Sequence, residues 1–217
     1  MADSTNASGL SFWQRYASVY DTFMAKDKHA YNWLGDEICV ELTADMNVLE
    51  LACGTGLVSE RIAPACRQLT ATDYSEKMIT KARKKVFDRY APPEAPDAVP
   101  SNIVFEQADI YRLPYSQHQF DAVVISNGLH IISDPIEGLK HIRRVLKPGG
   151  KLIAPTFMHE DSPGNKLFRK PMEWLGFTSY SMWTPDDYKE FFTDNDWSIK
   201  RSMIIPASFP INLVIAI

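Results

Sequence analysis

The stretch Met46-Asn47-Val48-Leu49-Glu50-Leu51 is a short apolar run, and Ala52-Cys53-Gly54-Thr55-Gly56 follows it directly. A run of this length that stops at Gly54 and Gly56 predicts a buried strand that enters a tight turn. The residues from 57 to about 65 then predict a helix. Glycines at such a turn allow backbone conformations and a close approach of a ligand that a Cβ atom would obstruct. The sequence therefore predicts a ligand-binding turn between a strand and a helix.

The order of strand and helix repeats along the chain. Further strands are predicted at residues 69–72, 102–106, 120–126 and 151–157. One helix is predicted from Ser75, its N-cap, to about Tyr90, and another from Asp134-Pro135 to Lys147-Pro148-Gly149-Gly150, where proline and glycine stop it. Because alternating strands and helices need crossover connections, the strands are expected to form a parallel sheet.

The two ends of the chain complete the predicted architecture. Apolar residues at mixed three- and four-residue steps between Leu10 and Leu42 predict two helices. Thr184-Pro185-Asp186-Asp187 predicts the start of a last helix, which reaches about Phe192. The β-rich runs 198–205 and 211–217 predict a final antiparallel hairpin.

These elements predict an α/β fold with one domain. The chain has 217 residues, of which 45% are hydrophobic and 23% charged, as in an ordinary globular protein. We expect a three-layer, Rossmann-like, seven-stranded and mostly parallel sheet that ends in an antiparallel hairpin strand. We divide the single domain, residues 1–217, into four parts. They are an N-terminal helical cap (1–45), a cofactor-binding core (46–157), a substrate-side insertion (158–183), and a terminal helix and hairpin (184–217).

Charge and cysteine content narrow the partners. A net charge of −4 gives no overall field that would attract nucleic acid or anionic membrane. The N-terminus lacks the basic start and apolar run of a signal peptide, so a cytoplasmic protein is expected. Neither the three cysteines nor the histidines show metal-ligand or disulfide spacing, and no metal is predicted. A basic run in the helix after Ser75 is interpreted as a solvated face; it comprises Lys81, Arg83, Lys84, Lys85 and Arg89.

An acid after the second strand suggests the chemistry of the ligand. Asp73 follows Gly54 by nineteen residues, at the place where a carboxylate can accept the hydroxyl protons of a ribose. The turn and Asp73 together predict an adenosine-type nucleoside. The segment Gly54 to Ser59 also nearly matches the dinucleotide fingerprint, so NAD is a rival ligand. Three other segments separate the two ligands: Glu50 before the turn, Gln107-Ala108-Asp109-Ile110, and Arg144-Val145-Leu146-Lys147-Pro148-Gly149-Gly150.

With these motifs in this order, the sequence resembles the class I S-adenosylmethionine-dependent methyltransferases, and among them the ubiquinone/menaquinone biosynthesis methyltransferase group. The resemblance covers Val48 to about Phe157. It implies S-adenosylmethionine as the cofactor and a small-molecule methyl acceptor, such as a quinone-like ring, a lipid amine or a small oxygen, sulfur or nitrogen nucleophile. It also implies direct in-line displacement, in which catalysis comes from holding the acceptor and the methyl group in near-attack geometry.

The resemblance also implies roles for individual residues. Glu50 to Gly56 would surround the methionine moiety, Asp73 would hold the ribose, and Asp109 with Ile110 would contact the adenine. Ala52 stands where the family has its first motif glycine, so the turn must admit a methyl group. The expected cofactor-binding residues are Tyr20, Glu50, Ala52, Cys53, Gly54, Thr55, Gly56, Asp73, Tyr74, Met78, Asp109, Ile110, Ser126 and Asn127.

The acceptor side is less specific. His130, just past the fourth strand, is the candidate catalytic base, and a packing role is the alternative. Tyr16, Tyr20 and Asp21 could close over the cofactor, or the two tyrosines could form a core stripe. A set of residues after the fifth strand could line an apolar acceptor pocket or pack the insertion onto the sheet: Met158, His159, Trp174, Tyr180, Met182 and Trp183.

Other functions remain as alternatives. A nucleic-acid substrate is disfavoured, because the segment after the fourth strand is Ser126-Asn127-Gly128-Leu129 and not an Asp/Asn-Pro-Pro-aromatic motif. An NAD-dependent oxidoreductase would need a substrate domain or a Tyr/Lys pair, and no YxxxK follows the fourth strand. A non-catalytic S-adenosylmethionine-binding module is a further alternative, because methyl transfer needs no signature residue. No integral membrane segment is expected, and the oligomeric state is left open.

Overall fold

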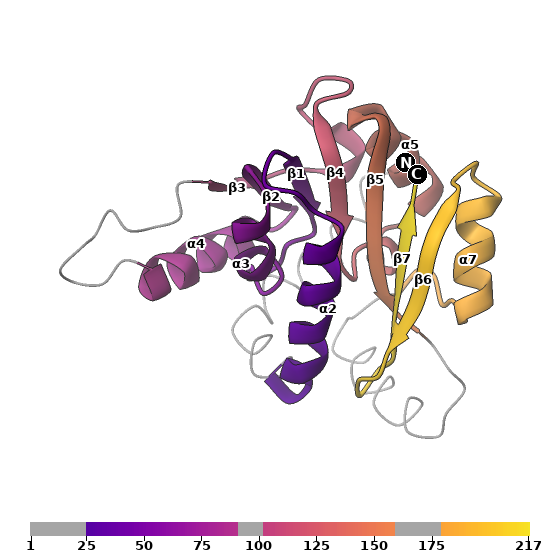
Figure 1. Ribbon diagram of the computed structural model, residues 1–217, viewed down its shortest axis with the longest axis horizontal. Helices are drawn as coiled ribbons and strands as arrows, with labels where there is room; N and C mark the ends of the chain where they lie inside the picture. Colours follow the sequence, from indigo (N-terminus) through magenta and orange to yellow (C-terminus); the bar gives the residue numbers. More distant parts are fainter. Residues whose placement is uncertain (1–24, 91–101, 159–178) are drawn as a thin grey trace.

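Seven strands form one sheet in the computed structural model, which describes residues 25–90, 102–158 and 179–217 (Figure 1). The strands are β1 Asn47–Leu51, β2 Gln68–Asp73, β3 Ile103–Gln107, β4 Phe120–Ile125, β5 Leu146–Phe157, β6 Ile199–Ile205 and β7 Ile211–Ala216. The helices are η1 Ala25–Asp27, α2 Lys28–Val40, α3 Ser59–Ile62, η2 Ala63–Ala65, α4 Glu76–Tyr90, η3 Ile110–Arg112, η4 Leu129–Ile131, α5 Pro135–Val145 and α7 Pro185–Thr193.

The strand order is β3-β2-β1-β4-β5-β7-β6. The pairs among the first five strands are parallel, and β7 pairs antiparallel with both β5 and β6. This arrangement confirms the expected seven-stranded, mostly parallel sheet with a terminal hairpin. The chain moves outward from β1 to β3 and then returns to start β4 on the other side of β1. The carboxyl ends of β1 and β4 therefore flank the crevice where open α/β sheets bind ligands.

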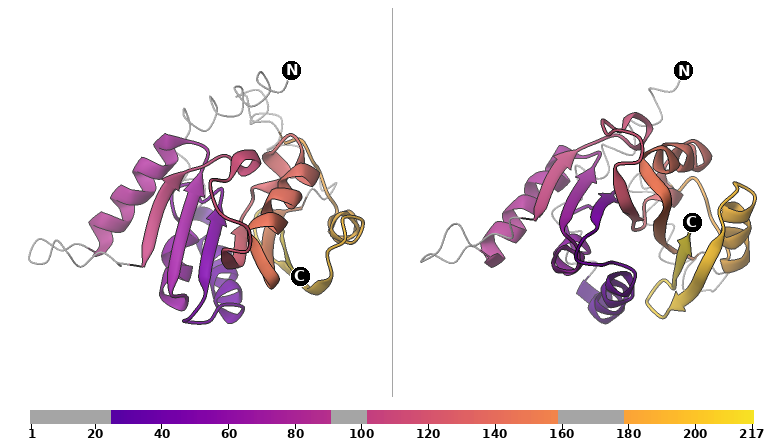
Figure 2. Two further views of the ribbon diagram at one scale, coloured as in Figure 1. Left: turned by 90° about the horizontal axis from the view of Figure 1, so that it is seen from above. Right: turned by 45° about the horizontal axis from the view of Figure 1, so that its top comes forward.

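Side chains of the central strands alternate between two buried layers. Val48 and Val124 pack in one hydrophobic cluster with residues of α2, α3 and α4. Leu49 and Val123 pack in the other cluster with residues of α5 and α7. Because neighbouring residues of a strand point to opposite faces, each apolar run supports both layers. Figure 1 shows α4 beside β3 at one end of the sheet and α7 beside β6 at the other, and Figure 2 gives two further views.

Two local predictions were wrong. The helix that was expected to stop at residues 147–150 ends at Val145, and β5 begins at Leu146. Phe120 pairs with Leu146 and Ala122 with Lys151, so residues 147–150 bulge out of the ladder. The Ser75 side chain does not cap α4. Its Oγ is buried without a hydrogen-bond partner, and the Met78 backbone N donates to the Ser75 backbone oxygen instead.

Several predictions fall outside the described residues. They include the first N-terminal helix with Tyr16, Tyr20 and Asp21, and the part of the insertion that contains His159 and Trp174. Among the residues that the structure describes, no helix is both long enough and apolar enough to cross a membrane.

The start of α7 has the predicted cap. Thr184 Oγ1 accepts a hydrogen bond from the Asp187 backbone N at 3.2 Å, and Asp187 Oδ2 accepts one from the Thr184 backbone N at 3.1 Å. Pro185 occupies the first helical position. This reciprocal pair satisfies two backbone donors that the first turn of a helix otherwise leaves unpaired.

Thr184→Ala is expected to lower the free energy of unfolding by about 1 kcal/mol, because it removes one half of the capping box. The melting temperature should fall by roughly 2–4 °C for a domain of this size. Thr193→Ala is the matched control, since Thr193 Oγ1 donates only to Glu190 O within the same helix. Equal losses in the two variants would show that the cap contributes nothing specific.

Candidate functional site

The turn after β1 has the backbone conformation that its glycines predict. Gly54 and Gly56 have φ angles of 56° and 79°, in the left-handed region. A Cβ atom on Gly56 would lie 3.3 Å from Ala82 Cβ, so α4 packs closely on the turn. Ala52 also has a positive φ, 54°, and therefore the methyl group at this position is accommodated at some strain.

Asp73, at the end of β2, braces this turn. Its Oδ2 accepts a hydrogen bond from Gly54 N at 2.9 Å, and its Oδ1 accepts the one from Ser75 N at 2.8 Å. Burial raises the pKa of Asp73 to about 6, although both of these hydrogen bonds favour the carboxylate. The structure thus brings together the two features, turn and acid, that predicted a nucleoside ligand.

Glu50 lies inside the protein beneath the turn. The side chain is fully buried, and its Oε2 accepts a hydrogen bond from Ser59 Oγ on α3. Its Oε1 is buried without a partner. Burial raises the pKa of Glu50 to about 8, and the nearby Asp73 charge adds to this shift, while the Ser59 hydrogen bond opposes it. A cationic ligand group beside Oε1 would supply the missing partner.

The loop after β4 packs against the same turn. A Cβ atom on Gly128 would lie 3.0 Å from Ala52 Cβ and 2.7 Å from Ile125 Cγ1, so only glycine fits there without a shift. Asn127 has a φ of 52° and donates its backbone N–H to Pro155 O at 2.8 Å. Ser126 is partly buried between these contacts. The loop after β1, with Ala52, and the loop after β4, with Asn127 and Gly128, therefore pack into one continuous wall of the candidate site.

Sequence reasoning missed Tyr31, a residue of α2 that reaches this wall. Asn127 Nδ2 donates a hydrogen bond to the Tyr31 hydroxyl oxygen at 2.9 Å, and Asn127 Oδ1 is buried without a partner. The apolar spacing of residues 10–42 predicts that Tyr31 lies on a helix. It carries no signal for the polar contact, because 96 residues separate the two side chains.

The predicted adenine-side residues lie next to Asp73. Ala108 N donates to Asp73 O at 3.1 Å, which places the segment after β3 at the end of β2. Asp109 Oδ1 accepts a hydrogen bond from Tyr111 N at 2.9 Å and so starts η3. Tyr74 is 42% exposed, whereas Met78 is buried. The structure brings these residues to the sheet edge that also holds the turn.

Cys53 and Thr55 are buried within the turn itself. Burial raises the pKa of the Cys53 thiol well above its ordinary value, which keeps the thiol neutral. Cys53 packs in the same hydrophobic cluster as Val48. Among the cofactor-binding residues that were expected, Tyr20 lies outside the described residues.

His130 is buried beside β5. Its Nδ1 lies 2.8 Å from Thr156 Oγ1, and its ring meets Phe157 edge-on with a centroid separation of 6.1 Å. Phe157 in turn meets Phe209 at 6.0 Å. The His130 backbone oxygen accepts a hydrogen bond from Tyr180 N at 2.9 Å. His130 therefore heads a row of aromatic rings.

The expected acceptor-pocket residues divide into two groups. Met158 is buried, and the Trp183 ring packs at a tilt against the rings of Tyr188 and Phe191 of α7, each with a centroid separation of 5.0 Å. These two residues therefore have a packing role. Tyr180 and Met182 are 39% and 54% exposed. His159 and Trp174 lie outside the described residues.

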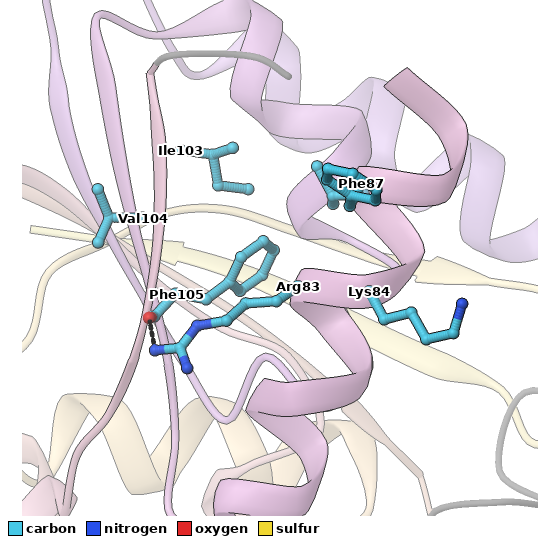
Figure 3. Close-up of a pocket in the computed structure, with 7 residues that line it drawn as sticks. Arg83, Lys84, Phe87, Ile103, Val104 and Phe105 are labelled. Atoms are coloured by element: carbon cyan, nitrogen blue, oxygen red, sulfur yellow. Dashed lines mark hydrogen bonds between the residues drawn. The ribbon is translucent and has the colours of Figure 1, made fainter. Parts of the chain in front are cut away.

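A groove between α4 and β3 contains none of the predicted site residues (Figure 3). Phe87 and Val104 are exposed there, and Arg83 donates to the backbone oxygen of Phe105 at 2.6 Å. Lys84 lies in an ion pair with Asp88 at 2.6 Å. These exposed, paired cations agree with the interpretation of the basic run as a solvated helix face. Within the described parts of the chain, no group of three or more His, Cys, Asp or Glu side chains could hold a metal ion.

Known proteins are similar to this chain over the region that contains the candidate site. Residues 49–154 match the family described as a methyltransferase domain. The chain is 34% identical over 137 residues to a ubiquinone/menaquinone biosynthesis C-methyltransferase of Pseudomonas putida. The matched segment covers 62% of this chain and 49% of the relative. It is 35% identical over 114 residues to a demethylmenaquinone methyltransferase of Clavibacter sepedonicus, covering 52% and 42% respectively. The chain thus spans about half the length of the curated relatives it matches.

Solved structures support the same fold. The magnesium protoporphyrin IX methyltransferase of Synechocystis, solved with bound S-adenosylhomocysteine, superposes with a TM-score of 0.68. The match covers 99% of this chain and 96% of that one at 19% sequence identity. Matched residues 49–154 run from β1 to β5 and include the turn, Asp73 and the β4 loop.

Proposed function

We propose that this chain, which carries a class I S-adenosylmethionine-dependent methyltransferase domain, transfers a methyl group from S-adenosylmethionine to a small-molecule acceptor. The observation that carries the proposal is the set of acceptor groups around one turn: the buried Glu50 carboxyl, the Asp73 carboxylate and the Asn127 amide oxygen. These groups match the donors of an amino acid joined to a ribose. When bound, S-adenosylmethionine supplies the electrophilic methyl group.

At the methionine end, Glu50 and Asn127 would hold the ammonium group. Each has a buried oxygen without a donor, and an unpaired buried acceptor is costly unless a ligand completes it. Glu50 lies on β1 and Asn127 in the loop after the neighbouring strand β4, since Glu50 pairs with Val124 in the ladder between β1 and β4. One cationic group with several N–H donors fits this arrangement.

At the ribose end, Asp73 would accept the hydroxyl protons. The hydrogen bonds from Gly54 N and Ser75 N already fix the orientation of this carboxylate, so little side-chain entropy is lost when a ribose binds. Asp109 and Ile110 would contact the adenine from the segment that Ala108 ties to β2.

For the acceptor we propose a flat ring with hydroxyl or oxo groups, such as a quinol. The row His130, Phe157 and Phe209 at the carboxyl end of β5 offers edges and faces against which such a ring can pack. The names of the relatives, which concern quinone biosynthesis, support the same class. The acceptor carbon would attack the methyl carbon as the C–S bond breaks, and the electron pair would stay on sulfur.

We assign removal of the acceptor proton to His130. The contact between its Nδ1 and Thr156 Oγ1 fixes the ring, and a fixed imidazole can act as a general base near neutral pH. No other step needs a reacting side chain, so the remaining catalysis would come from alignment of the acceptor and the methyl group.

Calorimetric titration with S-adenosylhomocysteine and, separately, NADH tests the cofactor. We expect the protein to bind S-adenosylhomocysteine and not NADH. Binding of NADH alone would favour the oxidoreductase alternative. Transfer of labelled methyl from S-adenosylmethionine to a panel of a hydroquinone, an aliphatic amine and a thiol then tests the acceptor. Binding without transfer to any acceptor would support a non-catalytic module.

A further inference from the structure

Two elements outside the β4 loop fix the position of Asn127. Its Nδ2 donates to the hydroxyl oxygen of Tyr31 on α2, and its backbone N donates to Pro155 O on β5. Its φ of 52° lies in the left-handed region, which asparagine adopts more readily than most other residues with a Cβ atom. These contacts therefore restrict the orientation of the Asn127 side chain.

In the structure, the contact with Tyr31 occupies one atom of the Asn127 amide and leaves the other for a ligand. An amide carries a donor on one side and an acceptor on the other, so a partner that holds Nδ2 leaves Oδ1 for the remaining space. In the structure Oδ1 is buried and accepts no hydrogen bond. The neighbouring Gly128 packs against Ala52 of the turn, so this acceptor belongs to the loop that contacts the turn.

Helix α2 is anchored independently of the crevice. Before its first turn, Asp27 Oδ1 accepts hydrogen bonds at 2.9 Å from both the N and Oγ of Ser208 in the β6–β7 turn. Further along, Glu37 Oε2 accepts one from Arg201 of β6 at 2.6 Å. Tyr31 lies between these anchors and is buried. Its hydroxyl is therefore in place before any ligand arrives.

We infer that Tyr31 is a positioning residue whose hydroxyl orients the Asn127 amide so that Oδ1 accepts a hydrogen bond from the ammonium group of the cofactor. The inference rests on the proposed function, because it needs a ligand with a cationic donor at its methionine end. Without the hydroxyl, the amide can rotate and turn Nδ2 toward that cation, where two donors face each other.

Tyr31→Phe tests the inference through two ligands. S-adenosylhomocysteine carries the ammonium group, and 5′-methylthioadenosine has the same adenosine without it. In calorimetric titrations the variant should bind S-adenosylhomocysteine about tenfold more weakly, the typical effect of one hydrogen bond to a charged group. Its affinity for 5′-methylthioadenosine should stay within about twofold of the wild type.

Tyr188→Phe is the matched control. It also removes the hydroxyl of a buried tyrosine, one that donates to Ala154 O at 3.0 Å on the other face of the sheet. We expect no change in affinity for either ligand. In an Asn127→Asp background, Tyr31→Phe should cost less than about twofold, because both carboxylate oxygens are acceptors whichever way the side chain turns.

Each outcome decides the inference. Selective loss of S-adenosylhomocysteine affinity that disappears in the Asn127→Asp background supports it. If Tyr31→Phe lowers the affinity for both ligands equally, or for neither, the inference is overturned. In that case, binding of S-adenosylhomocysteine by the wild type still supports the proposed function. If the wild type binds neither ligand, the proposed function fails and the inference falls with it.

Discussion

Asp73→Ala should lower the affinity for S-adenosylhomocysteine by about 100-fold or more. Two charge-assisted hydrogen bonds to the ribose would disappear, and each is worth about 1.5–3 kcal/mol. The variant also loses the hydrogen bonds that Asp73 accepts from Gly54 N and Ser75 N, so the turn itself becomes less well fixed. Calorimetric titration of the purified full chain measures the change, and circular dichroism checks that the variant is folded.

Asp121→Ala provides a matched control for this result. Asp121 also accepts a hydrogen bond from a backbone N–H, that of Asn47 at 2.8 Å, and it pairs with Lys147 at 2.6 Å. It lies where β1 begins, at the opposite end of the strand from the turn. We expect a loss of stability but an unchanged affinity. If Asp73→Ala bound as tightly as this control, Asp73 would have no role in ligand binding.

The sequence predicts the central sheet because its local signals and its tertiary environment agree. The run Ala122-Val123-Val124-Ile125 is apolar at every position, and the structure buries all four residues, two against each helical layer. The glycine turn is predicted for the same reason, since a positive φ at Gly54 and Gly56 is a local requirement that the residue type reveals. Thr184 and Asp187 likewise reveal the start of α7.

The features that sequence reasoning missed depend on contacts between distant residues. Val145 ends α5 before the proline and glycine that were expected to stop it, because Leu146 pairs with Phe120 on β4. The hydrogen bond from Asn127 to Tyr31 joins two segments through the fold alone. Residue type therefore predicts local conformation well and side-chain partners poorly.

The pH dependence of ligand binding is expected to come mainly from Glu50. Its pKa is raised to about 8, so the carboxyl is largely protonated in the free protein near neutral pH. An ammonium group beside Oε1 favours the carboxylate, so binding should release close to one proton at about pH 7. The affinity for S-adenosylhomocysteine should therefore rise with pH from about 6.5 and level off near 8. Asp73 titrates below this window, at about 6.

Glu50→Gln should remove this dependence. Glutamine has nearly the shape of the protonated carboxyl but cannot ionise, so its affinity should be flat across the window. The loss relative to the wild type should be largest at about pH 8, on the order of 100-fold, and should shrink toward about pH 6.5. Titrations in buffers with different ionisation enthalpies count the protons released. A wild-type affinity that is independent of pH, with no proton release, would contradict the assignment of Glu50 to the ammonium group.

The same substitution should make the free protein more stable at high pH, which separates lost binding from misfolding. The pKa of Glu50 in the folded state lies above its ordinary value of 4.5, so the folded protein binds the proton more tightly than the unfolded chain does. The stability that this proton provides is complete below pH 4.5 and is lost as the pH rises through about 8. Because Glu50→Gln does not have to bury an ionised carboxylate, its melting temperature should exceed that of the wild type above pH 8. A variant that bound the ligand weakly and also melted lower at that pH would indicate instead that Glu50 supports the fold through its hydrogen bond with Ser59.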